Sequence, residues 1–168
     1  ATGQSREVDF GHVGDIWHVD PHLLHALLAQ DYVPVLCSLA CDGEGGILNI
    51  NADTVATALA QAMKAEKLIV MTDVPGILRD KKDPTTLVSY LDTVEVRQMV
   101  ESGRITEGMR PKVEACLAAV ENGVHRAHVI DGTKEHALLE EVFTNAGSGT
   151  MIVTRRETPQ AAEAAAPA

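Results

Sequence analysis

Residues 49–77 read NINADTVATALAQAMKAEKLIVMTDVPGI, and this stretch decides the fold. Its Ala-rich middle, residues 52–64, has the spacing of a helix that packs closely against a sheet. The short apolar runs at residues 47–50 (ILNI) and 68–72 (LIVMT) are typical of buried strands. Because strands that alternate with helices form mostly parallel sheets with helices on both faces, the sequence predicts an α/β fold of that kind.

The same alternation continues on both sides of this unit. Asp20-Pro21 marks the start of a helix over 22–30, and Asp92 with Glu95 forms a capping-box pair that opens a helix ending near Ser102. The other expected elements are a strand or hairpin at 10–19, a buried strand at 33–39, helices at 111–122 and 135–143, and strands at 127–130 and 150–153. We expect one domain over residues 10–153, a loose segment at 1–9 and a disordered tail at 154–168.

The composition limits the classes of function. With 168 residues, 45% of them hydrophobic, the chain is expected to hold one globular core. A net charge of −10 argues against nucleic acid and anionic membrane surfaces as partners, since both need a basic footprint. The three cysteines form neither a disulfide framework nor a zinc motif, and no apolar run approaches the roughly 20 residues of a membrane span. These observations predict a protein of the reducing cytoplasm.

Polar residues follow three of the expected strands, at Asn49–Asp53, Thr72–Gly76 and Asp131–Gly132. Ligands of open α/β sheets bind at the carboxyl ends of the strands, so these three segments are candidate binding sites. Asn51 or Asp53 could instead simply cap the helix that follows. Neither G-x-x-x-x-G-K-[ST] nor G-x-G-x-x-G occurs in the chain, so a nucleotide would have to be bound by another design.

Two groups of cationic or titratable residues are further site candidates. Lys112 lies near the start of the helix at 111–122, where the helix dipole disfavours a cation. It is either a solvated surface residue or a lysine that meets a phosphate together with the helix N-terminus.

Four histidines lie close together in the sequence, but no carboxylate or cysteine pattern completes a metal site with them: His12, His18, His22 and His25. No metal site is predicted.

Several segments resemble the C-terminal half of the N-acetylglutamate kinases, which belong to the amino acid kinase family. The resemblance runs in unbroken order over residues 10–153 and rests on NINADTVATALAQAM, LIVMTDVPGILRD, ITEGMRPKVEACLAAVENGVHRAHVIDG and HALLEEVFTNAGSGTMIV. The pattern TDVxGI is shared by the whole family. The combination of NINAD, GMxxK and IDG with GTMI is much more specific.

The resemblance implies phosphoryl transfer from ATP, bound with Mg²⁺, to the γ-carboxylate of N-acetyl-L-glutamate in arginine biosynthesis. Asn49 is similar in position to the residue that contacts the substrate amide, and Asp53 to the one that organises the catalytic lysines. Lys112 corresponds to the lysine that stabilises the transferring phosphoryl group. The nucleotide-binding residues implied are Asp73, Val74, Pro75, Gly76, Ile77, Leu78, Arg104, Ile105 and Thr106.

The sequence also departs from the family pattern. The glycine-rich N-terminal segment, with its first lysine and its substrate-binding arginine, is not found in these residues. We therefore expect the chain to hold the nucleotide-binding half alone, through truncation or division of the protein. One alternative is a kinase for carrier-protein-bound aminoadipate or glutamate, against which Asn51 argues. The others are an arginine-binding regulatory fragment without independent activity and a purely structural fragment.

A regulatory site is implied by the same resemblance. His128, Glu141 and Gly147 match the signature of members that are inhibited by L-arginine. The alternative is that they are an ordinary strand residue, a surface helix residue and a turn former. The full-length enzyme is expected to be a homo-oligomer. This chain is expected to be a dimer or a monomer, because the N-terminal helix that joins the hexameric relatives is not among its residues.

Overall fold

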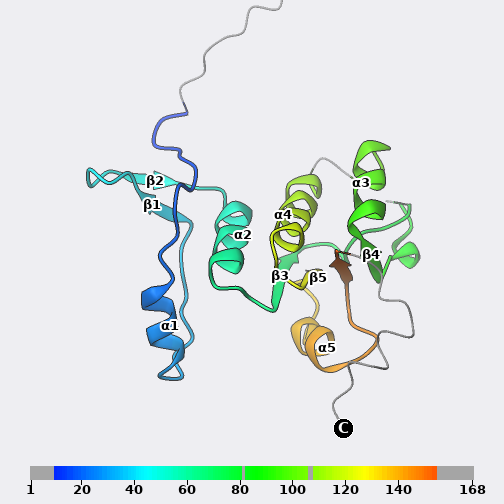
Figure 1. Ribbon diagram of the computed structural model, residues 1–168. Helices are drawn as coiled ribbons and strands as arrows, with labels where there is room; N and C mark the ends of the chain where they lie inside the picture. The colour runs from blue at the N-terminus through cyan, green and yellow to red at the C-terminus, as the bar shows by residue number, and fades with distance from the viewer. Residues whose placement is uncertain (1–9, 81, 106–107, 155–168) are drawn as a thin grey trace, which may run out of the picture.

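The computed structural model describes residues 10–80, 82–105 and 108–154, and Figure 1 shows the arrangement of their helices and strands. The elements are α1 (His22–Leu28), β1 (Leu39–Cys41), β2 (Ile47–Asn49), α2 (Ala52–Ala62), β3 (Lys67–Thr72), the 3-10 turn η1 (Pro84–Thr86), β4 (Tyr90–Asp92), α3 (Thr93–Glu101), α4 (Arg110–Glu121), β5 (Arg126–Asp131), α5 (Ala137–Phe143) and β6 (Thr150–Val153).

Four strands form the main sheet in the order β3-β5-β6-β4. The pairs β3–β5 and β4–β6 are parallel, and the central pair β5–β6 is antiparallel, with Val129 opposite Thr150. The predicted mostly parallel α/β sheet is therefore confirmed, with one reversal. Because of that reversal, β6 begins near the carboxyl end of β5, at the edge where ligands are bound in sheets of this kind.

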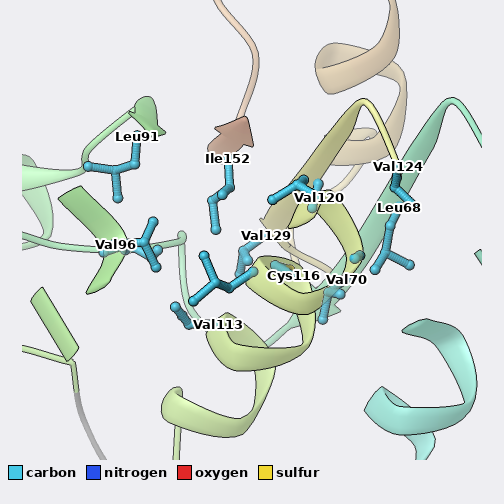
Figure 2. Close-up of a cluster of buried hydrophobic side chains, with 14 of the residues drawn as sticks. Leu68, Val70, Leu91, Val96, Val113, Cys116, Val120, Val124, Val129 and Ile152 are labelled. Atoms are coloured by element: carbon cyan, nitrogen blue, oxygen red, sulfur yellow. The ribbon is translucent and has the colours of Figure 1, made fainter. Parts of the chain in front are cut away.

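Helices cover both faces of the sheet, as the alternation predicted. Side chains alternate between the faces of a strand, so Ala127 and Val129 of β5 join the main apolar core. That core also contains Val113, Cys116 and Val120 of α4, which lie beside Val129 and Ile152 in Figure 2. His128 is on the opposite face of β5, where it contacts Glu141 of α5.

Helices α2 and α4 pack side by side with their starting ends together. Thr57 Oγ1 donates to the carbonyl of Ala115 at 3.2 Å, and Gln61 Nε2 donates to that of Ala118 at 3.1 Å. Both contacts advance in the same direction along the two helices, so the helices run parallel. The first turns of α2 and α4 therefore lie next to each other.

The N-terminal arm, defined here as residues 10–50, differs from the sequence prediction. The predicted buried strand at 33–39 is wrong: Val33 is 85% exposed and Val35 is 93% exposed, and strand structure begins only at Leu39. The predicted strand or hairpin at 10–19 is reduced to a single bridge between Val13 and Asn49. Among the described residues, β1 pairs only with β2, β2 has no further partner besides the Val13 bridge, and the 33–38 segment joins no strand. An apolar run without a partner strand stays irregular.

Other local predictions can be checked residue by residue. The capping box is confirmed, since Glu95 N donates to Asp92 Oδ1 at 2.9 Å and Asp92 N donates to Glu95 Oε2 at 3.1 Å. The three-residue strand β4 was missed. Thr154 was assigned to the disordered tail, but its hydroxyl donates to the carbonyl of Val120 and its own carbonyl accepts from the hydroxyl of Thr93. The ordered part of the chain therefore extends one residue further than predicted. The rest of the predicted loose and disordered ends lies outside the described residues.

Candidate functional site

An ion pair joins the first turns of α2 and α4. Lys112 Nζ lies 3.2 Å from each carboxylate oxygen of Asp53, and the two side chains are 29% and 18% exposed. Lys112 is thus neither a free surface cation nor fully buried. Its ammonium is held over the start of its own helix, where the dipole alone would disfavour it, because the Asp53 carboxylate compensates.

Asn51 holds the start of α2 and so orients Asp53. Its side-chain oxygen accepts from Asp53 N at 2.8 Å and from Thr54 N at 3.3 Å, which makes it the N-cap. An aspartate would cap the helix equally well, so this role does not separate free acetylglutamate from a carrier-bound substrate. Helix capping, considered above for Asn51 or Asp53, applies to Asn51, and it leaves Asp53 free to face Lys112.

Cys116 lies one turn below this ion pair. Burial raises the pKa of its thiol to about 12, with a further increase from the Asp53 carboxylate and a partial decrease from Lys112. Its thiol therefore remains neutral at physiological pH and forms part of the apolar floor beneath Asp53 and Lys112.

The two predicted nucleotide loops meet at one cavity of about 100 Å³. It is lined by Val74, Gly76, Ile77, Leu78, Arg104, Ile105 and Met109. Thr106 lies outside the described residues. The Asp73–Leu78 loop leaves the carboxyl end of β3, and Gly76 adopts φ +139°, a backbone conformation that favours glycine. Both loops are thus brought to the sheet edge that the sequence indicated.

Met109 links the cavity to the ion pair, and sequence reasoning did not single it out. It lines the cavity and immediately precedes α4, whose first turn carries Lys112. Its position inside the GMRPK motif was the available signal. Within the described part of the chain, no side chain caps the start of α4.

Asn49 does not join this group in the structure. It is an exposed residue at the end of β2, with its backbone bonded to His12 and Gly14 of the N-terminal arm. A cavity of about 430 Å³ beside the ion pair is lined by Asp15, Asn51, Asp53, Thr57, Pro111 and further residues of α2 and α4, not by Asn49. Its substrate contact stays a prediction.

The three predicted arginine-site residues lie together on the far face of the sheet. His128 Nδ1 lies 2.5 Å from Glu141 Oε1, and both side chains are 5% exposed. Glu141 Oε2 accepts from Ser148 N at 2.6 Å and Gly149 N at 3.0 Å. Gly147 has φ +65°, and a Cβ there would lie 2.9 Å from Glu141 Oε2.

These contacts set the ionisation of Glu141. Burial raises the pKa of its carboxyl, but the hydrogen bonds from Ser148 and Gly149 and the interaction with His128 outweigh it, so the pKa lies below its ordinary value. Glu141 is therefore neither a surface helix residue nor a carboxylate open to solvent. Both of its oxygens are engaged within the protein.

Other kinds of site are not found in the described part of the chain. Its residues contain no group of three or more His, Cys, Asp or Glu side chains placed to hold a metal ion, the four N-terminal histidines included. None of the helices formed by these residues is long and apolar enough to cross a bilayer.

Comparisons with known proteins agree with this architecture. The model of the amino acid kinase family matches residues 1–131. The acetylglutamate kinase of Synechococcus sp. (strain WH7803) is 52% identical over 145 residues, which are 86% of this chain and 50% of that relative. The acetylglutamate kinase of Methanosphaera stadtmanae is 49% identical over 151 residues, covering 90% of this chain and 51% of that relative.

A solved structure is also similar. The N-acetylglutamate synthase from Neisseria gonorrhoeae, complexed with coenzyme A and L-arginine, superposes with a TM-score of 0.82 at 27% identity. The match covers 92% of this chain and 35% of the synthase. The chain spans about half the length of the curated relatives it matches. Since the family model covers most of its residues, the chain belongs to the amino acid kinase family.

Proposed function

We propose that this chain is the nucleotide-binding half of an acetylglutamate kinase, which transfers the γ-phosphoryl group of ATP to the γ-carboxylate of N-acetyl-L-glutamate. The observation that carries the proposal is the Lys112–Asp53 ion pair in the first turn of α4, the helix that begins directly after Met109 of the cavity formed by the two loops. It is supported by relatives about half identical to the chain that are named acetylglutamate kinase. Cytoplasmic location and homo-oligomerisation remain predictions.

The chemistry asks for cations rather than for a general base. A carboxylate nucleophile is already ionised at neutral pH, so the difficulty is to bring two anions together and to stabilise charge on the transferring phosphoryl group. Lys112 and the start of α4 supply positive charge at one place. Mg²⁺, carried by the nucleotide, would neutralise phosphate charge further.

Asp53 has a positioning role in this proposal. Its carboxylate holds the Lys112 ammonium at 3.2 Å through a charge-assisted contact. The Asn51 cap fixes the first turn of α2, and the cross-helix bond from Thr57 keeps α2 against α4. The lysine is thereby oriented before the nucleotide binds, which lowers the reorganisation needed in the transition state.

The test is Lys112→Ala in the complete kinase, with the N-terminal half present. Loss of a cation that acts on the transition state should lower kcat by about 10²–10³-fold, with a much smaller effect on KM. The unfolding free energy should change by no more than about 1 kcal/mol, since the ion pair is partly exposed. Arg110→Ala removes another cation from the same turn, 60% exposed and paired with Glu114, and should leave kcat unchanged. An unchanged kcat in Lys112→Ala would remove this residue from the mechanism.

We further propose that L-arginine binds near His128, Glu141 and Gly147 and inhibits the complete kinase. The supporting observation is that the similar synthase structure is named as a complex with L-arginine. Arginine carries two cationic groups and needs a carboxylate, which Glu141 provides. Because both Glu141 oxygens are engaged, arginine must replace some of their present partners, and the 147–149 segment would differ between free and inhibited states.

Inhibition by arginine should be compared between the wild type, Glu141→Gln and Glu140→Gln. Glu140 is the neighbouring residue, is 40% exposed and pairs with Lys134 instead, so its substitution should preserve inhibition. Glu141→Gln should raise the inhibitory concentration at least tenfold, because a charge-assisted contact is lost. A wild type that ignores millimolar arginine would disprove regulation and leave the kinase proposal standing.

A further inference from the structure

We propose that Thr150, the first residue of β6, is a positioning residue for the Asp73–Leu78 loop, and that its hydroxyl holds this loop in the conformation that accepts the nucleotide. The inference rests on the proposed function, since it concerns the nucleotide cavity of that kinase. It gives a role to Thr150, which lies within the GTMI pattern quoted above but is not among the site residues predicted from the sequence.

The contact between Thr150 and the loop is direct and buried. Ile77 N donates to Thr150 Oγ1 at 2.8 Å, and the two residues are 3% and 0% exposed. A Cβ on Gly76 would lie 2.7 Å from the same hydroxyl oxygen, so the loop approaches Thr150 as closely as a glycine permits. The partners are 73 positions apart in the sequence, so this is a tertiary contact and not a feature of a local turn.

Ile77 is held through both of its backbone polar groups. Its N–H is bonded to Thr150, and its carbonyl accepts from Val88 N at 2.9 Å. Ile77 and its neighbours Gly76 and Leu78 line the cavity. Without the hydroxyl, a buried backbone donor would lack its partner, and this cost would favour a displaced loop. The shape of a cavity of only about 100 Å³ would change with a small displacement.

Thr150 itself is fixed by the surrounding backbone. It pairs with Val129 of β5, and the next residue, Met151, donates to the carbonyl of Ser89 at 2.9 Å. The two residues before it, Ser148 and Gly149, donate to the buried Glu141 carboxylate. The Thr150 hydroxyl is therefore an acceptor with a fixed position on the sheet, and its hydrogen bond with Ile77 fixes the position of the Asp73–Leu78 loop.

Two substitutions separate positioning from packing. Thr150→Val keeps the shape of the side chain and removes the hydroxyl, whereas Thr150→Ser keeps the hydroxyl and removes a buried methyl group. Affinity for ATP–Mg²⁺ should be measured by titration calorimetry on the complete kinase, together with the Tm of each variant. If the loop of Thr150→Val occupies the competent position about a tenth of the time, its apparent Kd rises about tenfold. Thr150→Ser should bind within about twofold of the wild type although its Tm also falls.

Each result decides one of the two proposals. A wild type that does not bind ATP–Mg²⁺ overturns the proposed function, and this inference falls with it. If the wild type binds and Thr150→Val binds equally well, only the positioning role is disproved. The same holds if the affinities of the two variants fall in proportion to their Tm values, because a purely structural residue would behave in that way.

Discussion

The N-terminal arm and the region from α2 to β6 contain similar apolar runs, but the run in the arm is exposed and the run in the second region is buried. Val35 in the run VPVLCSL is 93% exposed, whereas Val129 in the run AHVI is completely buried. The second run lies between β3 and β6 and beneath α4, while the 33–38 segment joins no strand of the described chain. An apolar run thus becomes a buried strand only where a partner strand and an element covering one face are available.

The largest expected difference between the two regions concerns isoleucine truncation. Ile152→Ala removes a fully buried side chain from β6 and should lower the unfolding free energy by about 2–5 kcal/mol. Ile47→Ala, in β2 of the arm, removes one that is 60% exposed and should cost less than about 1 kcal/mol. Urea unfolding of both variants measures the difference. Equal losses would mean that the arm is packed against apolar surface in solution.

A glycine pair tests how tightly the sheet edge is packed. A Cβ on Gly149 would overlap the carbonyl oxygen of Val129, so Gly149→Ala should destabilise the protein by about 1–3 kcal/mol. A Cβ on Gly108 would meet no atom of the described residues within 4 Å, so Gly108→Ala should be nearly neutral. Thermal unfolding compares the two, and a neutral Gly149→Ala would show that the 147–149 segment moves away freely.

Two carboxylate–histidine pairs of equal length provide a test of burial. Glu141–His128 and Asp20–His22 both measure 2.5 Å, but the first pair is 5% exposed on each side and the second 68% or more. At pH 7, Glu141→Gln should lower the unfolding free energy by about 1 kcal/mol, the usual net value of one hydrogen bond. Asp20→Asn in the arm should have no measurable effect.

The pH dependence of the Glu141 effect has a definite sign. Because the folded-state pKa of Glu141 is lowered from 4.5, the carboxylate contributes stability that is fully present above pH 4.5 and is lost as the pH falls through the folded value. The difference between wild type and Glu141→Gln should therefore shrink on acidification below pH 4.5. A difference that stays constant on acidification from neutral pH through this range would contradict the lowered pKa.

The reactivity of the cysteines compares the two regions without any substitution. Cys37 and Cys41 in the arm are exposed, whereas Cys116 is buried and burial raises the pKa of its thiol to about 12. A thiol reagent at mildly alkaline pH should label the first two rapidly and Cys116 only after unfolding, because the thiolate is the reactive form. Rapid labelling of all three would show that α4 opens in the native protein.

Much of the fold could be predicted because its signals are local. The capping box of Asp92 and Glu95, the apolar run of β3 and the glycine that follows α4 each depend on neighbouring residues. The prediction of a buried strand at residues 33–39 was wrong because the burial of a strand depends on partners that are far away in the sequence. The three-residue strand β4 carries too short a pattern to be recognised, and its strand structure is defined by pairing with β6.

For the candidate site too, the positions of some residues could be predicted from the sequence, but the contacts between them could not. The positions of Asp53 and Lys112 were suggested by resemblance, and their 3.2 Å contact follows from the parallel packing of α2 on α4, which no local pattern reveals. Thr150 gave only a weak signal, a polar residue at the head of an apolar strand. Its partner Ile77 is remote in sequence, so the contact required the sheet order to be known.

The alternation of side chains along β6 limits where insertions and deletions can occur in this protein. Side chains alternate along β6, so Thr150 and Ile152 lie on one face and Met151 on the other. One residue inserted or deleted between α5 and β6 would shift the strand by one position and turn Thr150 and Ile152 away from the core. The loop at residues 144–149 should therefore accept changes of side chain more readily than changes of length, and indels compatible with a folded protein should be concentrated elsewhere.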